Sequence, residues 1–428
     1  MATKLLKEKL VPKTIFSGFV LKLLFIMFFV EFVKGALIIT FLPIYLDDVL
    51  KVGALVIGWT LAVQYLGDNL LRTPIGWLID QIGYRACMLT GVLSTFASVA
   101  IIATTSSYFW IIVACALLGM GTAPLWPCVI TGTTEIAGEK QRGTIMGVVY
   151  MAWLSGVGLG PFVITFFIGN DHYQSAFRLL IGIMIAVVIV AFLLPGMEKH
   201  LQSKEAEKAK MQKNAAHVGL KRPGNRFQRA QQYLNEVRKS LTMSPLMFPA
   251  MFFQTFALGL LTPVLTLYAT KILALSGEQY RYFLLAGGLV TVLFMVPVGK
   301  LVDRWGTKWF LHIGFLLSSL VLLGFTYTRS MPMLYTLVVL LGASYALLIP
   351  AWNALIAAAI PPEKRGAVWG FFLTIEGLGT TIGPVVSGKI WDDISYHAPF
   401  LASGSVLFVL FFVHIYISQK NKGVLQHE

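Results

Sequence analysis

The chain alternates between long apolar runs and short polar connections. Apolar runs of about eighteen or more residues are typical of helices that cross a membrane, because backbone groups in lipid must be hydrogen-bonded within their own segment. The sequence predicts twelve such helices, at residues 15–46, 54–79, 86–105, 109–134, 143–169, 176–195, 245–271, 281–301, 309–327, 332–360, 366–390 and 397–418. The expected fold class is therefore an all-α, multi-pass membrane protein.

The overall composition supports this class. Of the 428 residues, 57% are hydrophobic and only 13% are charged, and the mean hydropathy is +0.74. A soluble domain of average composition carries about 25% charged residues. Cys87, Cys115 and Cys128 all lie in or beside apolar runs, which predicts small packing residues rather than a disulfide framework or a metal site.

The net charge of +14 is concentrated in one segment. Residues 198–239 carry eleven Lys/Arg and four Asp/Glu, which accounts for half of the total. Basic loops stay on the cytoplasmic side of a membrane, so this segment predicts a cytoplasmic linker that contacts anionic lipid rather than nucleic acid. We expect an N-terminal half at 1–195, a linker at 196–244 and a C-terminal half at 245–428 in the cytoplasmic membrane, with both termini cytoplasmic.

A pattern of twelve residues occurs twice, at 74–85 and 297–308. Both copies read P-x-G-x-L-x-D-x-x-G-x-[RK], and they are 223 residues apart. A repeat this long indicates a duplicated unit, so we expect two pseudo-symmetric six-helix halves. The motif residues are Gly76, Asp80, Gly83 and Arg85 in the first half, and Gly299, Asp303, Gly306 and Lys308 in the second.

Ionisable residues interrupt two apolar runs of the first half. Glu31 and Lys34 are three residues apart, so they lie on one helix face and can pair. Gln64, Asp68 and Arg72 form a polar stripe at four-residue spacing along the next helix. Charged side chains in a membrane interior are costly and normally face a cavity or a polar partner. They therefore predict a functional site, and the alternative is a structural ion pair between packed helices.

The repeat also shows how the two halves differ. Residues of the first half correspond to those 223 positions later in the second. Glu31 corresponds to Gln254, Lys34 to Ala257, Asp68 to Thr291 and Trp126 to Ile349, whereas Trp153 corresponds to Glu376. The first half thus supplies charged and aromatic residues, and the second half is mostly apolar. Further candidates for a cavity wall are Gln64, Arg72, Gln254, Trp352, Asn353 and Glu376. This asymmetry favours an amphipathic substrate whose polar head, such as a sugar, contacts carboxylates and tryptophan faces.

The repeated motif and the twelve predicted helices resemble the major facilitator superfamily over nearly the whole chain. The resemblance implies two six-helix halves around a central cavity, alternating access, and a site near the bilayer midplane. It also implies that the repeated motif is a conformational latch on the cytoplasmic side. A glycine pattern over 147–161 resembles the antiporter motif of the superfamily, and its copy over 370–384 leaves helix packing as the alternative.

Several short motifs carry a closer resemblance. They are Glu31-Phe32-x-Lys34-Gly35, Pro124-x-Trp126, Trp153-Leu154-x-Gly156, Tyr268-Ala269-Thr270-Lys271, Pro350-Ala351-Trp352-Asn353 and the run from Trp369 to Pro384. Together they resemble the lipoteichoic-acid anchor glycolipid flippases of Gram-positive bacteria. The resemblance implies a proton-coupled antiporter that moves a diglucosyl-diacylglycerol between leaflets, with a proton gradient as energy source and no cofactor or metal ion. The head-group and proton-coupling residues it implies are Glu31, Lys34, Asp68, Trp126 and Trp153.

Two departures from this family leave other functions open. Lys34 stands where the family has an arginine, and Glu376 where it has an amide, so a paralogue with another substrate is one alternative. A multidrug or small-metabolite/proton antiporter is another, although Cys115 occupies a position where drug antiporters carry an arginine. A membrane enzyme needs acid/base or metal ligands in a surface loop, and the loops contain no such cluster, so we expect no enzyme activity.

Overall fold

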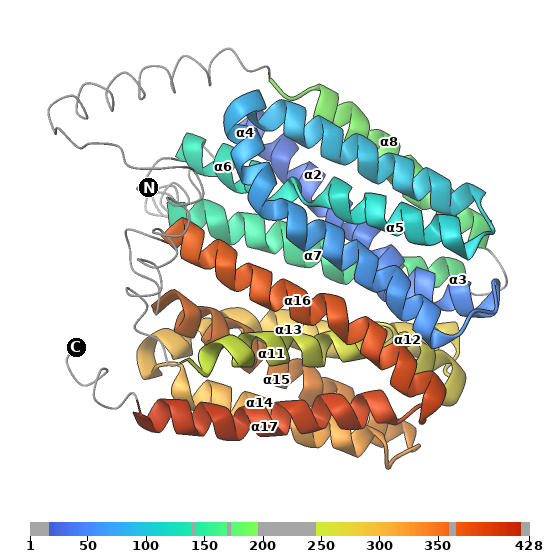
Figure 1. Cartoon of the computed structure of the whole chain (residues 1–428), viewed down its shortest axis with the longest axis vertical. Helices are drawn as coiled ribbons and strands as arrows, with labels where there is room; N and C mark the ends of the chain where they lie inside the picture. Colours follow the sequence, from blue (N-terminus) through green and yellow to red (C-terminus); the bar gives the residue numbers. More distant parts are fainter. Residues whose placement is uncertain (1–16, 138–141, 169–172, 196–244, 359–364, 421–428) are drawn as a thin grey trace, which may run out of the picture.

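The computed structural model describes residues 17–137, 142–168, 173–195, 245–358 and 365–420. The predicted linker at 196–244 lies outside the described residues. Figure 1 shows long helices that run side by side, with those of the first half above those of the second. Each of the twelve apolar runs predicted from the sequence corresponds to a helix, to part of one, or to consecutive helical segments, which confirms the expected fold class.

In the first half, the first predicted run is one continuous path through three helical segments. These are α2 (Gly18–Gly35), the π-helical η2 (Ala36–Phe41) and α3 (Leu42–Asp48). The other elements are α4 (Ala54–Thr104), α5 (Tyr108–Thr122), α6 (Leu125–Ala137), α7 (Arg142–Ile168) and α8 (Tyr173–Phe192). Short π-helical segments occur often at functional sites, and η2 begins two residues after Lys34.

The second half repeats this arrangement. Its first run is divided into α11 (Met247–Leu261), α12 (Val264–Leu267) and the π-helical η5 (Tyr268–Ile272). The other elements are α13 (Gly277–Trp305), α14 (Lys308–Phe325), α15 (Met331–Ala358), α16 (Arg365–Asp393) and α17 (Ala398–Lys420). We call the end of the bundle at which α2 begins and α17 ends the terminal end, and the opposite end the far end (Figure 1).

The second glycine of the repeated motif makes the turn that ends a helix in each half. Gly83 has φ 83° and ψ 159° inside α4, and Gly306 has φ 76° and ψ 173° directly after α13. This backbone region is essentially confined to glycine, because a side chain there collides with its own backbone. The motif therefore contains a conformational requirement for glycine at the same point of each half.

Replacing Gly306 by alanine should destabilise the protein by about 1–3 kcal/mol through backbone strain alone. No atom lies within 4 Å of the Cβ that the substitution adds, so crowding does not contribute. Gly288 in α13 is an equally open but helical position, where alanine should stabilise the fold by about 0.5–1 kcal/mol. Thermal unfolding of both variants in detergent micelles measures the difference, and equal midpoints would contradict the assignment.

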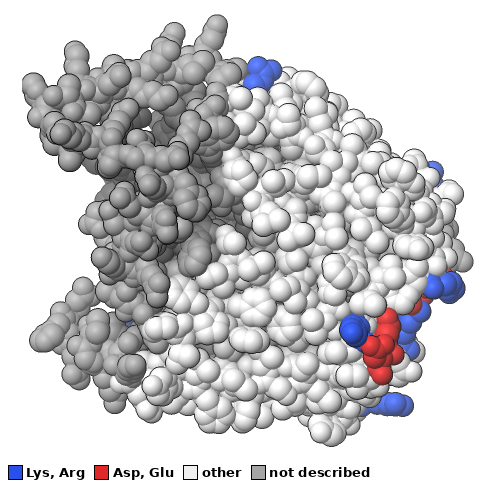
Figure 2. Space-filling view, in the orientation of Figure 1, with Lys and Arg blue, Asp and Glu red and all other residues white. Residues whose placement is uncertain are grey.

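The described surface is that of a membrane protein. Ten helical stretches among the described residues are long and apolar enough to cross a bilayer. Figure 2 shows a face that is almost wholly uncharged over the described residues, with most of its charged side chains gathered at the right-hand rim. The two predicted runs that are missing from the ten are 54–79 and 366–390, which contain Asp68 and Glu376. These runs belong to α4 and α16, which pack against each other.

The buried apolar residues form one large cluster in each half. Close packing of α7 on α2 in the first cluster depends on glycine, because a Cβ at Gly156 or Gly160 would overlap the backbone carbonyl oxygen of Phe28 or Phe32. Gly379 of α16 packs in the same way on the carbonyl of Phe252 in α11. The geometry supports the packing interpretation of the two glycine patterns.

Candidate functional site

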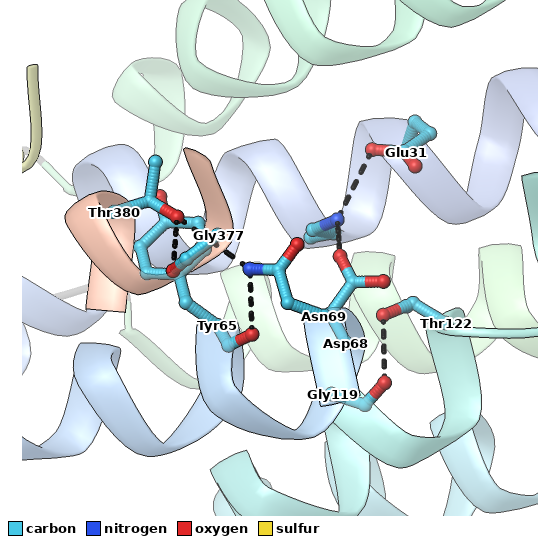
Figure 3. A network of polar contacts seen from close by, with 9 residues as sticks. Glu31, Tyr65, Asp68, Asn69, Gly119, Thr122, Gly377 and Thr380 are labelled. Atoms are coloured by element: carbon cyan, nitrogen blue, oxygen red, sulfur yellow. Dashed lines mark hydrogen bonds and ion pairs between the residues drawn. The ribbon is translucent and has the colours of Figure 1, made fainter. Parts of the chain in front are cut away.

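A buried charge cluster lies at the end of α2, which is midway along the continuous path α2–η2–α3, and in the first part of α4. The Lys34 Nζ is 2.7 Å from Asp68 Oδ2 and 3.7 Å from Glu31 Oε2. Glu31 is 2% exposed and Asp68 is 3% exposed, and the Lys34 side chain is 14% exposed. Figure 3 shows the Glu31 and Asp68 carboxylates on either side of the lysine nitrogen. The pairing of Glu31 with Lys34 that the sequence predicts is confirmed, and Asp68 joins it.

The packing of α5 on α4 fixes the position of Asp68. A Cβ at Gly119 would overlap the carbonyl oxygen of Gln64 and would lie 3.0 Å from the backbone nitrogen of Asp68. The two helices thus approach at backbone distance next to the carboxylate. Thr122 donates to the Gly119 carbonyl from one turn further along the chain (Figure 3). Because backbone packing is rigid, the backbone of Asp68 is held in a set position relative to α5.

Gln64 lies one turn before Asp68 and is completely buried. Among the described residues, neither its amide nitrogen nor its amide oxygen has a hydrogen-bond partner. A buried amide without partners is costly, so such groups usually mark a place where another polar group binds. The structure places Gln64 one turn from the charge cluster, and its predicted role in a cavity wall stays a prediction.

An aromatic cluster lies nearer the terminal end. The rings of Trp126 and Trp153 are 5.6 Å apart between centroids, and that of Tyr150 lies 5.2 Å from Trp126 and 6.3 Å from Trp153. All three pairs are tilted or edge-to-face, which is the arrangement that aromatic rings prefer. The structure therefore brings together the two tryptophans predicted from the sequence. Tyr150 was missed, although its spacing of three residues from Trp153 places both on one face of α7.

The second half contributes a polar contact of its own. Trp352 of α15 donates from Nε1 to a carboxylate oxygen of Glu376 in α16 at 2.9 Å, and the Glu376 carbonyl accepts from the Thr255 hydroxyl at 2.7 Å. Two of the predicted wall residues of this half thus touch each other. Of the remaining two, Gln254 is buried in α11, whereas Asn353 is exposed on α15.

The two halves meet at mid-depth along α4 and α16. Asn69 donates from Nδ2 to the hydroxyl of Thr380 at 3.5 Å, and Gly377 packs directly against the Asn69 side chain (Figure 3). Asn69 also donates to the carbonyl of Tyr65 at 2.9 Å within α4. We call this contact the α4–α16 seam. Asn69 could not be singled out from the sequence, because it is one more polar residue in a polar stretch.

The halves are joined more strongly at the far end. Asp392 of α16 accepts from the first two backbone nitrogens of α4, at 3.1 and 2.8 Å, and so caps that helix. Lys271 pairs with Asp47 and Asp48. At the same end, α13 also contacts α7. The Arg281 guanidinium lies 3.6 Å from the ring centroid of Phe166 and donates to the Thr165 hydroxyl at 3.2 Å. Every polar contact between halves found in the described residues lies at mid-depth or at the far end.

The repeated motif lies at the terminal end and is only partly described. Arg72, Gly76 and Asp80 lie along α4, but their surroundings fall outside the described part of the structure. Arg85 donates to the carbonyl of Phe192 in α8, which belongs to its own half. In the second copy, Gly299 lies within α13, Asp303 is exposed, and Lys308 lies over the ring of Trp309. The latch role implied by the resemblance stays a prediction.

Comparison with known proteins identifies the family. The Major Facilitator Superfamily profile matches residues 24–246 and 247–425. The proton-coupled antiporter flippase LtaA of Staphylococcus saprophyticus is 26% identical over 405 residues, which span 93% of this chain and 94% of the relative. The protein of the same name from Staphylococcus aureus (strain N315) is 24% identical over 414 residues, which span 95% and 97%.

Solved structures agree on the fold. The nucleoside transporter NupG superposes with a TM-score of 0.70 at 14% identity, covering 94% of this chain and 100% of its own. A POT family transporter in complex with 5-aminolevulinic acid superposes with a TM-score of 0.72 at 15% identity, covering 94% and 96%. The family profile covers both halves, and the chain therefore belongs to the Major Facilitator Superfamily of multi-pass membrane transporters.

Proposed function

We propose that this transporter flips a glycolipid of the diglucosyl-diacylglycerol type across the cytoplasmic membrane in exchange for protons, and that it catalyses no chemical reaction. The observation that carries the proposal is the lysine held between two buried carboxylates at mid-depth. The proton-coupled antiporter flippases LtaA named above are similar over almost the whole chain. The substrate class is the one implied by the resemblance of the sequence motifs to the lipoteichoic-acid anchor glycolipid flippases.

The charge cluster supports coupling to protons. While Asp68 is ionised, Lys34 stays in the short contact with it. Protonation of Asp68 weakens that contact, and Lys34 then favours Glu31, which lies 3.7 Å away. The lysine thus has two arrangements that differ by one proton on Asp68. A change of this kind biases an equilibrium between two conformations of the helices that carry the groups.

Recognition of a sugar head follows from the neighbouring groups. Carboxylates accept hydrogen bonds from hydroxyl groups, and the amide of Gln64 is buried beside them without a partner among the described residues. The faces of Trp126 and Trp153 suit the C–H faces of sugar rings. The repeat leaves the equivalent positions of the second half largely apolar, with Ala257, Thr291 and Ile349, which suits acyl chains.

The contacts between halves indicate which side is closed. At the far end the halves are held together by Asp392, Lys271 and Arg281, which closes that end. The basic residues of the linker and of the terminal-end loops place the terminal end in the cytoplasm by the positive-inside rule. We therefore expect this conformation to receive the lipid head from the cytoplasmic leaflet.

The test is a leaflet-accessibility assay in proteoliposomes. A fluorescent diglucosyl-diacylglycerol is reconstituted with the protein, and the fraction that becomes accessible to a membrane-impermeant quencher is followed with and without an imposed pH gradient. We expect translocation that the gradient accelerates. Protein-free vesicles and a fluorescent phosphatidylcholine serve as controls. Equal rates for both lipids would contradict glycolipid specificity, and gradient-driven efflux of a soluble drug or metabolite alone would favour an antiporter of small molecules.

A further inference from the structure

We propose that Glu376 and Trp352 form a second proton site, in the C-terminal half, where Glu376 takes up and releases a proton during transport. The proposal rests on the proton-coupled transport proposed above and adds a second residue to it. Glu376 is the only acidic residue within the apolar runs of the second half. It also lies in run 366–390 of α16, one of the two predicted runs that are absent from the ten apolar spans.

The position of Glu376 is fixed from two sides. Trp352 of α15 is 4% exposed and donates its indole N–H to Glu376 Oε1 at 2.9 Å. Thr255 of α11 donates to the backbone carbonyl of the same residue at 2.7 Å. The carboxyl group therefore points toward α15 and cannot turn freely. An indole is a donor only, so it accepts no proton and carries no charge that could compensate a carboxylate.

No described cation pairs with Glu376, in contrast to Asp68. Of the helices around α16, α11 and α12 carry no titratable side chain. The titratable residues that the others bring are Tyr65, Asp68, Asp80, Tyr84, Arg85 and Cys87 on α4, Tyr335 and Tyr345 on α15, and His414, Tyr416 and Lys420 on α17. Arg72 and Asp80 of α4 fall outside the described side chains. None of the described groups forms a hydrogen bond or an ion pair with the Glu376 carboxylate.

A carboxylate without a cation is strongly disfavoured in a membrane interior. One neutral hydrogen bond compensates only part of that cost. The group is therefore stable as the neutral acid in this conformation, with the indole donating to its carbonyl oxygen. Ionisation becomes favourable when water or a cation reaches the group, and the proton then leaves to water. Opening and closing of the helices around Glu376 thus changes its proton occupancy.

The α4–α16 seam connects this site to the first one. Gly377, the residue after Glu376, packs on the side chain of Asn69, the residue after Asp68. Asn69 is also hydrogen-bonded to Thr380 of α16. Any movement of one half against the other at this depth therefore changes the position of Glu376 relative to Asp68. Glu376 moreover occupies the repeat position of Trp153, whose ring belongs to the aromatic cluster of the first half.

Infrared spectroscopy of the purified protein in lipid tests the site without relying on transport. The spectrum in neutral buffer should contain a carbonyl band of a protonated carboxylic acid that disappears on titration to alkaline pH. Glu376→Gln keeps an acceptor for Trp352 but removes the acid, so this band should be lost. Trp352→Phe removes the hydrogen bond to the carbonyl, so the band should move to higher frequency. Glu278→Gln, at an exposed acid of α13, is the matched control and should leave it unchanged.

The transport assay supplies the second readout. The number of protons exchanged per flipped lipid, measured with a pH dye inside the vesicles, should fall at least twofold in Glu376→Gln and stay unchanged in Glu278→Gln. An intact carboxylic-acid band in Glu376→Gln, or an unchanged proton count, would overturn the proposal. If the wild-type protein flips no lipid but its carboxylic-acid band is lost in Glu376→Gln, the proposed substrate is refuted and the acid site at Glu376 stands.

Discussion

Asp68→Asn should abolish the response of lipid translocation to a pH gradient while the protein stays folded. Asparagine still offers an oxygen to Lys34, but it cannot ionise, so the 2.7 Å contact loses its charge. A hydrogen bond to a charged group contributes about 1.5–3 kcal/mol. A loss of this size changes an equilibrium constant by about tenfold or more. The ratio of translocation rates with and without the gradient, about one in the variant, is the quantity to measure.

Two further variants separate the role of Asp68 from a general effect of charge. Asp393→Asn removes an exposed carboxylate of α16 and should behave as the wild type. Lys34→Arg keeps the positive charge and adds a forked donor that can reach both carboxylates, so gradient dependence should persist. A clear gradient response in Asp68→Asn would exclude Asp68 as the essential coupling residue and transfer that role to Glu31 or to Glu376.

Gly160→Val should be strongly disruptive to the first half. The added Cβ would overlap the carbonyl oxygen of Phe32, so α7 must move away from α2. Forcing extra atoms into a packed core costs typically about 1–3 kcal/mol, and contact with backbone leaves little room for relief. Since α2 carries Glu31 and Lys34, the same displacement separates them from Asp68. We expect a lower unfolding midpoint together with loss of gradient-driven translocation.

The control for this prediction lies two residues away. Gly158 is on the same helix, and no atom lies within 4 Å of a Cβ added there. Gly158→Val has the same change in size and the same β-branched side chain, so the intrinsic helix propensity cancels in the comparison. A similar loss of stability in both variants would mean that glycine matters in α7 for flexibility and not for its contact with α2.

Much of the fold could be predicted because apolar runs and a long repeat are properties of the sequence itself. The same holds for the pairing of Glu31 with Lys34, since three-residue spacing in a helix puts both on one face. The seam could not be predicted. Asn69 and Asp68 are neighbours, and a rotation of 100° per residue decides which of them faces the other half.

Contacts between segments that are distant in the sequence could not be predicted for a related reason. Asp392 caps α4 across 338 residues, and nothing near it in the sequence indicates a helix start. The relative placement of two halves is set by packing over a whole surface, whereas caps and spacings are local. Tyr150 is a different case. Its spacing of three residues from Trp153 can be read from the sequence, but only the ring contacts in the structure show that it belongs to the aromatic cluster.

The polarity of α4 and α16 has a consequence for how the chain is made. During synthesis a segment enters the bilayer through the translocon, and a charged residue at its centre opposes entry by about 2.5–3.5 kcal/mol. The segment with Asp68 emerges soon after α2, whose Lys34 can neutralise it. The segment with Glu376 is synthesised some 300 residues after its partner α4, and it can be stabilised only against helices that are already in place. Membrane integration of the eleventh predicted span should therefore depend on helices made before it, both α11 and α15 of its own half and α4 of the first half.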